Sequence, residues 1–185
     1  MHVVFKHARL ALTVVILVVV SVLVRTSGLS AWLNPDHIQR LVESAGPWGP
    51  LAFMLVFIGA VVSQVPGLIF VAVAPALFRL PEAWALSFVA SNLAVILNFE
   101  LVRRLGGQPL AQIENARLRR LFDRLESEPV KTVALLRTIT VMFPPVTSAL
   151  ALTSLRSRDH VLGSLLGMLL PVTLLLLASS VFWQR

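Results

Sequence analysis

Residues that could bind an anion interrupt two apolar stretches of this chain. VVSQVPGLIF contains a glutamine, a proline and a glycine, and LLRTITVMFPP contains an arginine followed by two prolines. A guanidinium binds phosphate oxygens through two parallel hydrogen bonds, and a helix that begins after a break has unpaired N–H groups with partial positive charge. Together these residue types predict a site for a phosphate headgroup. Its candidate residues are Gln64, Pro66, Gly67, Arg137, Pro144 and Pro145.

A third polar group lies between these stretches, at the end of another apolar run. Glu100, Arg103 and Arg104 are at salt-bridge spacing in NFELVRRLGG, so a structural ion pair is the favoured interpretation. Glu100 and Arg103 are also candidate substrate-binding residues. Asn92 and Asn98 fall on different faces of the same predicted helix, where hydrogen bonds between helices are their favoured role.

The patterns of most enzyme sites do not occur in the sequence. The four histidines are scattered, without H-E-x-x-H spacing, and no P-loop glycine pattern is present. The chain has no cysteine, which excludes a disulfide framework and thiolate chemistry. The basic residues form no soluble nucleic-acid module. We therefore expect a protein that is not an enzyme, uses no metal or cofactor and binds no nucleic acid.

Composition indicates which solvent surrounds the elements that position these residues. Of the 185 residues, 57% are hydrophobic and only 14% are charged, and the mean hydropathy is +0.84. A soluble domain is closer to half apolar and a quarter charged. At about 20 residues per membrane segment, the chain has room for several segments in one membrane domain. The net charge of +7 then fits cytoplasmic loops and anionic lipid.

Residues 1–49 predict two helices before this domain. The apolar run from Leu10 to Val24 follows Lys6 and Arg9. An uncleaved transmembrane helix with a cytoplasmic N-terminus is favoured over a signal peptide. The amphipathic segment 34–46 predicts a helix at the membrane surface.

The run 50–79 predicts a re-entrant hairpin rather than a membrane span. Each half has about 13 residues and so is roughly 20 Å long, too short for a hydrocarbon core of about 30 Å. Seven positive residues follow the next span, 83–102. They lie in the cytoplasm only if 50–79 turns back, as the positive-inside tendency requires.

The same pattern recurs after a predicted cytoplasmic amphipathic helix, 108–128, which either binds anionic lipid or docks on the protein. A second hairpin, 131–155, is broken at the proline pair and precedes a span, 160–182. The fold predicted for residues 50–182 is an all-α integral membrane domain, an inverted repeat of re-entrant hairpin plus transmembrane helix. Arg137 would then lie about 9 Å along its half-helix from Lys131. A functional arginine is favoured there over one that snorkels or binds carbonyls.

Several motifs in residues 45–172 resemble the VTT-domain family of DedA-like membrane proteins. Phe99, Arg103 and Gly106 match its F-x-x-x-R-x-x-G element, and other parts of the pattern are matched by Pro66, Gly67, Arg137, Pro144, Leu152, Thr153, Gly163, Gly167 and Pro171. Ala151 stands where the family usually has glycine, and Ser157 where it often has an aromatic residue. Gln64 stands near the place of an acidic residue thought to couple transport to protons. Coupling here would use Glu82, Glu100 or the substrate itself.

The resemblance implies a function in moving lipids, including polyprenyl phosphates, between membrane leaflets. We therefore expect a lipid or lipid-phosphate translocase or scramblase in the inner or plasma membrane, with anionic lipids as partners. A homo-oligomer is an open alternative to a monomer. Two other functions remain open: an ion-coupled transporter of a small anion, and a membrane scaffold that transports nothing.

Overall fold

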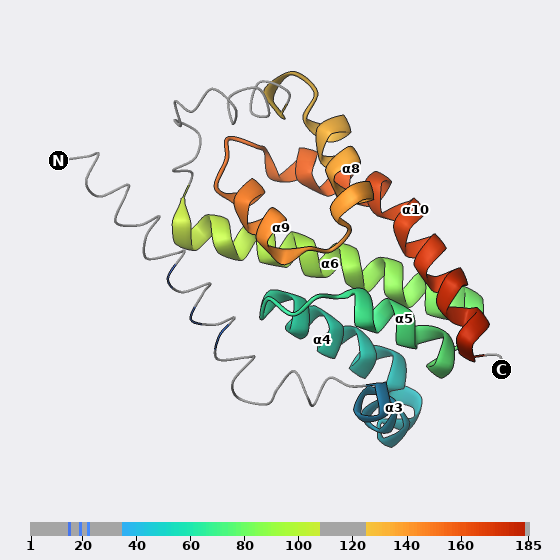
Figure 1. Ribbon diagram of the computed structural model, residues 1–185. Helices are drawn as coiled ribbons and strands as arrows, with labels where there is room; N and C mark the ends of the chain where they lie inside the picture. Colours follow the sequence, from blue (N-terminus) through green and yellow to red (C-terminus); the bar gives the residue numbers. More distant parts are fainter. Residues whose placement is uncertain (1–14, 16–18, 20–21, 23–34, 108–124, 184–185) are drawn as a thin grey trace.

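The computed structural model describes residues 35–107 and 125–183, together with Val15, Val19 and Val22. Every element in the ranges 35–107 and 125–183 is a helix (Figure 1). The predicted all-α fold is confirmed at this level. The predicted N-terminal transmembrane helix and most of the predicted helix 108–128 lie outside the described residues.

A short helix, α3 (Pro35–Ser44), precedes a single 3-10 turn, η1 (Gly46–Trp48). Asp36 lies in the first turn of α3, where a negative charge is favourable. The apolar face of α3 buries Ile38 and Val42 against α4 and α5. Trp48 is 71% exposed beside this helix. The amphipathic pattern therefore serves at least in part to dock α3 on its own protein.

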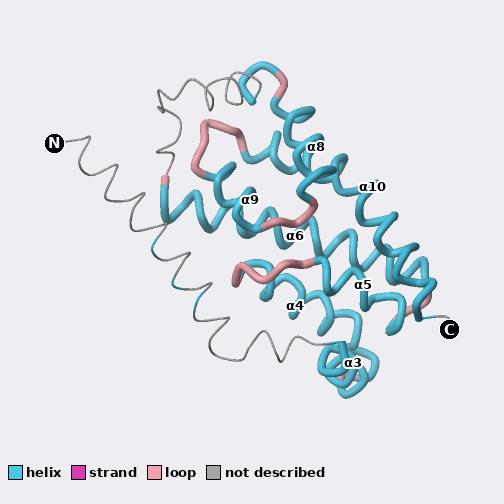
Figure 2. The backbone as a smooth tube through the Cα atoms, viewed as in Figure 1, coloured by secondary structure: helices cyan, strands magenta, loops and turns pink. Residues whose placement is uncertain are grey.

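The apolar stretch 50–79 folds as two short helices, α4 (Gly49–Val62) and α5 (Leu68–Leu77). Phe57 in α4 stacks on Phe70 in α5, with ring centroids 4.8 Å apart. Phe53, one turn earlier, contacts Phe78 after the end of α5 at 5.4 Å. Because the start of α4 meets the end of α5, the chain turns back at the break. Figure 2 shows the loop that joins the two helices.

The break after α4 is a backbone motif that ends helices. The N–H of Gln64 donates to the Val61 carbonyl at 3.0 Å, and the N–H of Val65 donates to the Ala60 carbonyl at 2.9 Å. This pair of bonds is a Schellman motif, in which the first residue past the cap has a positive φ and is usually glycine. Here that residue is Gln64, with φ +67°.

A long helix, α6 (Leu80–Gly106), crosses the middle of the molecule. Pro81 and Glu82 occupy its first turn, as suits a helix N-terminus. Gly107, with φ +68°, ends it. In Figure 1, α4 and α5 lie on one side of α6 and α9 lies on the other, and all three pack against it.

The second interrupted stretch also folds as two short helices, α8 (Pro129–Thr140) and α9 (Pro144–Ala151). Between them, the N–H of Phe143 donates to the Thr140 carbonyl at 3.1 Å and closes a tight turn. Val141 follows Thr140 in this turn with φ +51° and ψ −116°. These angles match the first central position of a type II′ turn, which glycine normally occupies. Within the described ranges, Gln64 and Val141 are the non-glycine residues with positive φ, and each lies at a helix break.

The last helix, α10 (Ser157–Trp183), runs alongside α8. Two glycines on one face of α10 allow this contact. A Cβ added to Gly163 would lie 2.6 Å from the Cβ of Val133, and one added to Gly167 would lie 2.7 Å from the Cβ of Arg137. This close approach at G-x-x-x-G spacing is typical of helix pairs in membranes. It places α10 directly against the face of α8 that carries Arg137.

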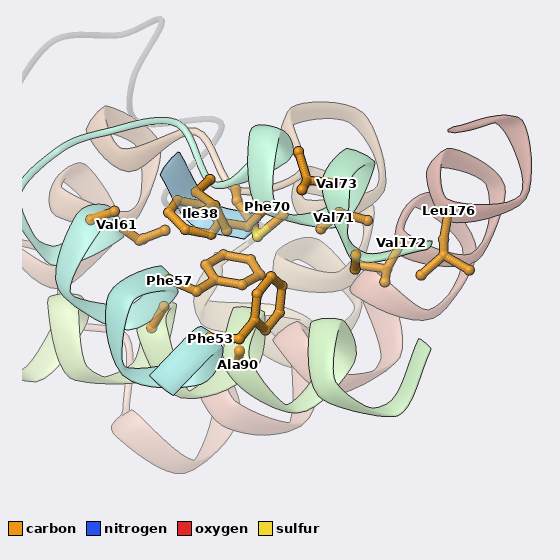
Figure 3. Packing of buried hydrophobic residues seen from close by; sticks show 14 of the residues in the cluster. Ile38, Phe53, Phe57, Val61, Phe70, Val71, Val73, Ala90, Val172 and Leu176 are labelled. Carbon is orange, nitrogen blue, oxygen red and sulfur yellow. The ribbon is translucent and has the colours of Figure 1, made fainter. Parts of the chain in front are cut away.

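A hydrophobic core lies between α4, α5, α6 and α10, as Figure 3 shows. Its aromatic part consists of Phe53, Phe57 and Phe70, each 0% exposed. Val172 and Leu176 of α10 pack against the same cluster. A second, smaller cluster joins the end of α6 to α8 and α9. We call α4 and α5, with the loop between them, the first broken helix, and α8 and α9 the second. The first broken helix is therefore fixed by apolar packing on α6 and α10.

Two helices in the described ranges, α6 and α10, are long and apolar enough to cross a membrane. Each has 27 residues and so is about 40 Å long. Many of the leucines on α10 are exposed, among them Leu162, Leu166, Leu170, Leu174 and Leu177. An exposed apolar face of this length is suited to lipid.

Candidate functional site

Arg137, in the last turn of α8, is completely buried. Its Nε donates a hydrogen bond to the Ser164 Oγ at 3.3 Å. Its Nη1 donates to the Thr147 Oγ1 at 2.9 Å and to the Val141 carbonyl at 3.4 Å. Its Nη2 lies 2.9 Å from the His160 Nε2. The guanidinium thus connects α8, the break after α8, α9 and α10.

Every acceptor around Arg137 is electrically neutral. Within residues 35–107 and 125–183, one ion pair is formed, between Lys131 and Glu128 at 2.9 Å on the surface. The guanidinium has five N–H bonds. One on Nε, two on Nη1 and one on Nη2 have acceptors, so four are used. The hydrogen-bonding capacity of Arg137 is nearly satisfied, but its charge has no carboxylate partner in this part of the chain.

His160, in the first turns of α10, is also 0% exposed. A guanidinium has only donors, so the His160 Nε2 that faces Arg137 must accept. The ring is therefore neutral and carries its proton on Nδ1. That atom is buried and has no hydrogen-bond partner in the described structure. The other contact of the ring is a stack on Phe99, with centroids 4.0 Å apart.

The wide spacing of the four histidines in the sequence does not predict that His160 lies in the site. A signal was nevertheless present in the helical spacing. His160, Ser164 and Gly167 recur at i, i+4 and i+7 on α10 and so share one face. Gly167 marks that face as the one that meets α8. Polar residues beside a glycine contact face in an apolar helix were the feature that could have identified His160.

Arg103, a candidate binding residue, uses its side chain inside the protein. Its Nε donates to the Ala151 carbonyl at 3.0 Å, and its Nη2 donates to the Thr153 carbonyl at 3.0 Å. Its Nη1 donates to the Leu155 carbonyl. These carbonyls lie at the C-terminal end of α9 and in the link to α10, where a cation is favourable. The guanidinium also lies over the Phe99 ring, 4.3 Å from its centroid. In this structure Arg103 fastens α6 to the end of α9.

Glu100 does not form the ion pair that its spacing predicted. No carboxylate lies within 4.0 Å of Arg103 or Arg104 in the described ranges. Arg103 turns instead to the carbonyls at the end of α9 and in the link to α10, which offer three acceptors beside the second cluster of packed residues. Glu100 is partly exposed one turn before Arg103 and is not among the partners of Arg137.

Gln64, at the first break, is partly exposed and donates from Nε2 to the Asn98 Oδ1 at 3.2 Å. Asn98 is buried, and its Nδ2 has no partner in the described structure. This contact fits the expected role of Asn98 between helices. Asn92 instead donates to the carbonyl of Phe88 in its own helix, at 2.9 Å.

The two breaks lie close together in space. A Cβ added to Gly67 would lie 3.0 Å from the sulfur of Met142, which is in the second break. Met142 is buried in the same core as Phe57 and Val61 of the first broken helix. Pro66 is exposed beside this contact. Gly67 and Met142 therefore join the two tips through apolar packing rather than through polar groups.

The expectation that the helix beginning at Pro144 supplies N–H donors is wrong. Pro144 and Pro145 have no N–H groups. The next two N–H groups, of Val146 and Thr147, both point to the Phe143 carbonyl at 3.1 and 3.5 Å. The start of α5 differs: no described acceptor pairs with the N–H groups of Leu68 and Ile69. Backbone donors are available at the first break and not at the second.

A comparison with known protein families identifies the class of this chain. A model of the VTT domain matches residues 65–181, well over half of the sequence. The chain belongs to the VTT-domain family. No curated protein and no solved structure matches it.

The family match covers the candidate site residues except Gln64, which lies one position before it. It begins in the first break, at Val65, and ends near the end of α10, so it includes the second break, Arg137 and His160. It starts later than the resemblance seen in the sequence and leaves out α4. VTT-domain proteins are membrane proteins proposed to act as transporters or scramblases. The apolar helices α6 and α10 agree with a membrane protein of this family.

Proposed function

We propose that this VTT-domain protein moves lipids with an anionic phosphate headgroup, of the polyprenyl phosphate class, between the two leaflets of its membrane. The observation that carries the proposal is the guanidinium of Arg137, which is 0% exposed, lies beside a helix break and has no carboxylate partner in the described residues. Membrane insertion scales put the cost of a central arginine at about 3 kcal/mol. Such a cost is typical of residues in transport pathways.

The neutral surroundings of Arg137 suit an anion that binds and leaves. A carboxylate partner would neutralise the charge permanently, whereas hydroxyls, a carbonyl and an imidazole satisfy the N–H bonds and leave the charge in place. A hydrogen bond from a guanidinium to phosphate is about twice as strong as one between neutral groups. An arriving phosphate would therefore displace neutral acceptors with a net gain.

The ends of the helices support opposed entry of the two broken helices. The starts of α4 and α6 and the end of α10 carry Trp48, Trp84 and Trp183. Arg79 is also at the start of α6, but most basic residues lie at the opposite ends: Arg103, Arg104, Lys131, Arg156 and Arg158. Tryptophan is enriched at membrane surfaces, and basic residues are enriched on the cytoplasmic side. In this orientation α4–α5 enters from the outer side and α8–α9 from the cytoplasm.

Opposed entry places the meeting point of the two breaks near the membrane midplane, where transporters of this general design bind substrate. Arg137 is enclosed in the described conformation, so a headgroup reaches it only when the tips separate. The apolar contact between Gly67 and Met142 is the part that must open. Lipid tails would remain in the bilayer beside the exposed leucines of α10.

A leaflet-exchange assay tests this function. Purified protein is placed in liposomes with labelled polyprenyl phosphate, and the same assay is run with the corresponding polyprenyl alcohol. We expect the phosphate to cross and the alcohol not to be accelerated, because only the phosphate interacts with Arg137. Arg137→Ala should abolish the exchange, and Arg104→Ala, at an exposed arginine on α6, should not.

The assay also separates the other candidate functions. Equal movement of phosphate and alcohol would contradict an anion site. Uptake of a soluble anion without lipid exchange would identify a transporter of small anions instead. Folded protein that moves neither would support a scaffold.

A further inference from the structure

His160 stands out among the buried polar groups because the candidate site residues predicted from sequence do not include it. The ring is 0% exposed, it occupies one N–H bond of Arg137, and its Nδ1 has no partner in the described structure. A buried donor without a partner costs stability. Retaining an imidazole at this position therefore calls for a compensating use.

We propose that His160 is a positioning residue that holds Arg137 through a neutral acceptor and so leaves the arginine's charge free for a phosphate headgroup, an inference that rests on the proposed function. Because the guanidinium can only donate, the contact at 2.9 Å requires the uncharged tautomer with its proton on Nδ1. The histidine aligns the guanidinium without forming an ion pair with it.

Aromatic packing, rather than a hydrogen bond to Nδ1, fixes the orientation of the His160 ring. One side chain, Phe99, stacks on it at 4.0 Å with an angle of 18° between the rings. The other face of Phe99 contacts the guanidinium of Arg103, which is itself bound to the α9 carbonyls. The series Arg103, Phe99, His160 and Arg137 thus extends from α6 through α10 to α8. It orients the acceptor while leaving the Nδ1 proton unpaired.

This arrangement predicts what a carboxylate at the same position would do. A glutamate side chain is about as long as the distance that the His160 Nε2 spans, so it would reach Arg137 and form a buried ion pair. The pair would stabilise the empty protein, because the carboxylate would supply the countercharge that the described residues lack. It would also compete with phosphate for the guanidinium. Stability and transport should therefore change in opposite directions.

The experiment compares His160→Glu, His160→Gln and wild-type protein, with Arg158→Gln as a control that changes the net charge by the same amount at an exposed position near the start of α10. Thermal unfolding in detergent is measured with and without farnesyl phosphate, with farnesol as the uncharged reference. Leaflet exchange of polyprenyl phosphate is measured in liposomes. If His160 were merely structural, replacing it with glutamate would lower stability and transport together.

We expect His160→Glu to raise the melting temperature of the empty protein by about 2–4 °C, to abolish the further rise caused by farnesyl phosphate and to reduce exchange at least tenfold. His160→Gln offers a neutral oxygen at similar reach and should retain exchange within a few-fold of wild type. Arg158→Gln should match wild type in both measurements. Parallel loss of stability and exchange in His160→Glu, or equal loss of exchange in His160→Gln, would overturn the inference.

The melting measurements remain decisive if the proposed function fails. If wild-type protein moves no lipid phosphate but is stabilised by farnesyl phosphate and not by farnesol, the anion site exists and only the transport proposal is wrong. Loss of that stabilisation in His160→Glu then still supports the role of His160. If farnesyl phosphate does not stabilise the wild-type protein, the inference about His160 is overturned.

Discussion

The two broken helices use the same backbone device with different side-chain chemistry. Each has one non-glycine residue of positive φ at its break, Gln64 in the first and Val141 in the second. The first is held by stacked phenylalanines, and its polar contact is a neutral one between Gln64 and Asn98. The second encloses Arg137, whose guanidinium joins both of its halves to α10.

The charged side chain lies at the second break, but the unpaired backbone N–H groups lie at the first. The first break leaves N–H groups of Leu68 and Ile69 without described partners, whereas the prolines of the second remove the donors at the start of α9. The architecture therefore resembles a repeat, but the charge belongs to one half. Under the proposed function, recognition of the anion's charge therefore depends on the second broken helix, while the first contributes apolar packing and backbone N–H groups.

The largest expected effect tests this division of roles directly. Arg137→Lys keeps a positive charge but loses the planar, two-pronged donor, so exchange of lipid phosphate should fall at least tenfold. Gln64→Leu removes one neutral hydrogen bond, worth about 1 kcal/mol, and should reduce exchange only several-fold. Both rates are measured in liposomes and normalised to folded protein. Arg104→Lys, at an exposed position, is the matched control.

Equal losses in Arg137→Lys and Gln64→Leu would mean that the two breaks contribute equally and that the comparison fails. A wild-type rate of exchange in Arg137→Lys would contradict two-pronged binding by the guanidinium. The positive charge alone would then be sufficient. The control separates these outcomes from a general effect of replacing an arginine with lysine in this protein.

Local sequence signals predicted most of the helices. The prolines and the length of the apolar runs predicted breaks in 50–79 and 131–155, and the structure has a loop in each. The spans predicted for 83–102 and 160–182 lie inside α6 and α10. The observed helix bounds differ from the predicted ones because the ends of helices depend on backbone hydrogen bonds. For example, α5 begins at Leu68, after the Schellman motif, rather than at Pro66.

Contacts between distant residues could not be predicted in this way. The bond between Arg137 and His160 joins residues 23 positions apart, and Arg103 binds carbonyls about 50 positions away. Both depend on which helix faces pack together. The loss of donors at Pro144 and Pro145, in contrast, was visible in the sequence, because proline has no N–H wherever it lies.

The second expected effect concerns the contact between the two tips. A Cβ at Gly67 would lie 2.7 Å from the Phe57 ring, 2.9 Å from Val61 and 3.0 Å from the Met142 sulfur. Gly67→Ala should therefore lower the free energy of unfolding by about 1–3 kcal/mol through overpacking. Gly59→Ala is the matched control, because nothing lies within 4 Å of its added Cβ. It should be neutral or slightly stabilising, since alanine favours a helix interior.

Thermal unfolding of the two variants in the same detergent measures this difference. If Gly67→Ala unfolds at the temperature of Gly59→Ala, the tips are not in contact in the folded protein. A loss confined to Gly67→Ala would instead show that Gly67 is tightly packed in the folded protein, against Phe57 and Val61 of α4 as well as against Met142.

The smallest expected effect concerns the backbone at the second break. Val141 is β-branched and has φ +51°, a conformation that costs such a residue on the order of 1–3 kcal/mol. Val141→Ala and Val141→Gly both lose the packing of the valine side chain, but only the glycine variant loses the Cβ that causes the strain. Glycine should therefore be more stable than alanine here by about 1 kcal/mol, the reverse of the usual order in regular structure. Chemical unfolding of both variants gives the sign of the difference between their free energies of unfolding. A more stable alanine variant would show that this turn lacks the positive φ. Because both variants keep the carbonyl that accepts from Arg137, exchange should change by no more than a few-fold in either.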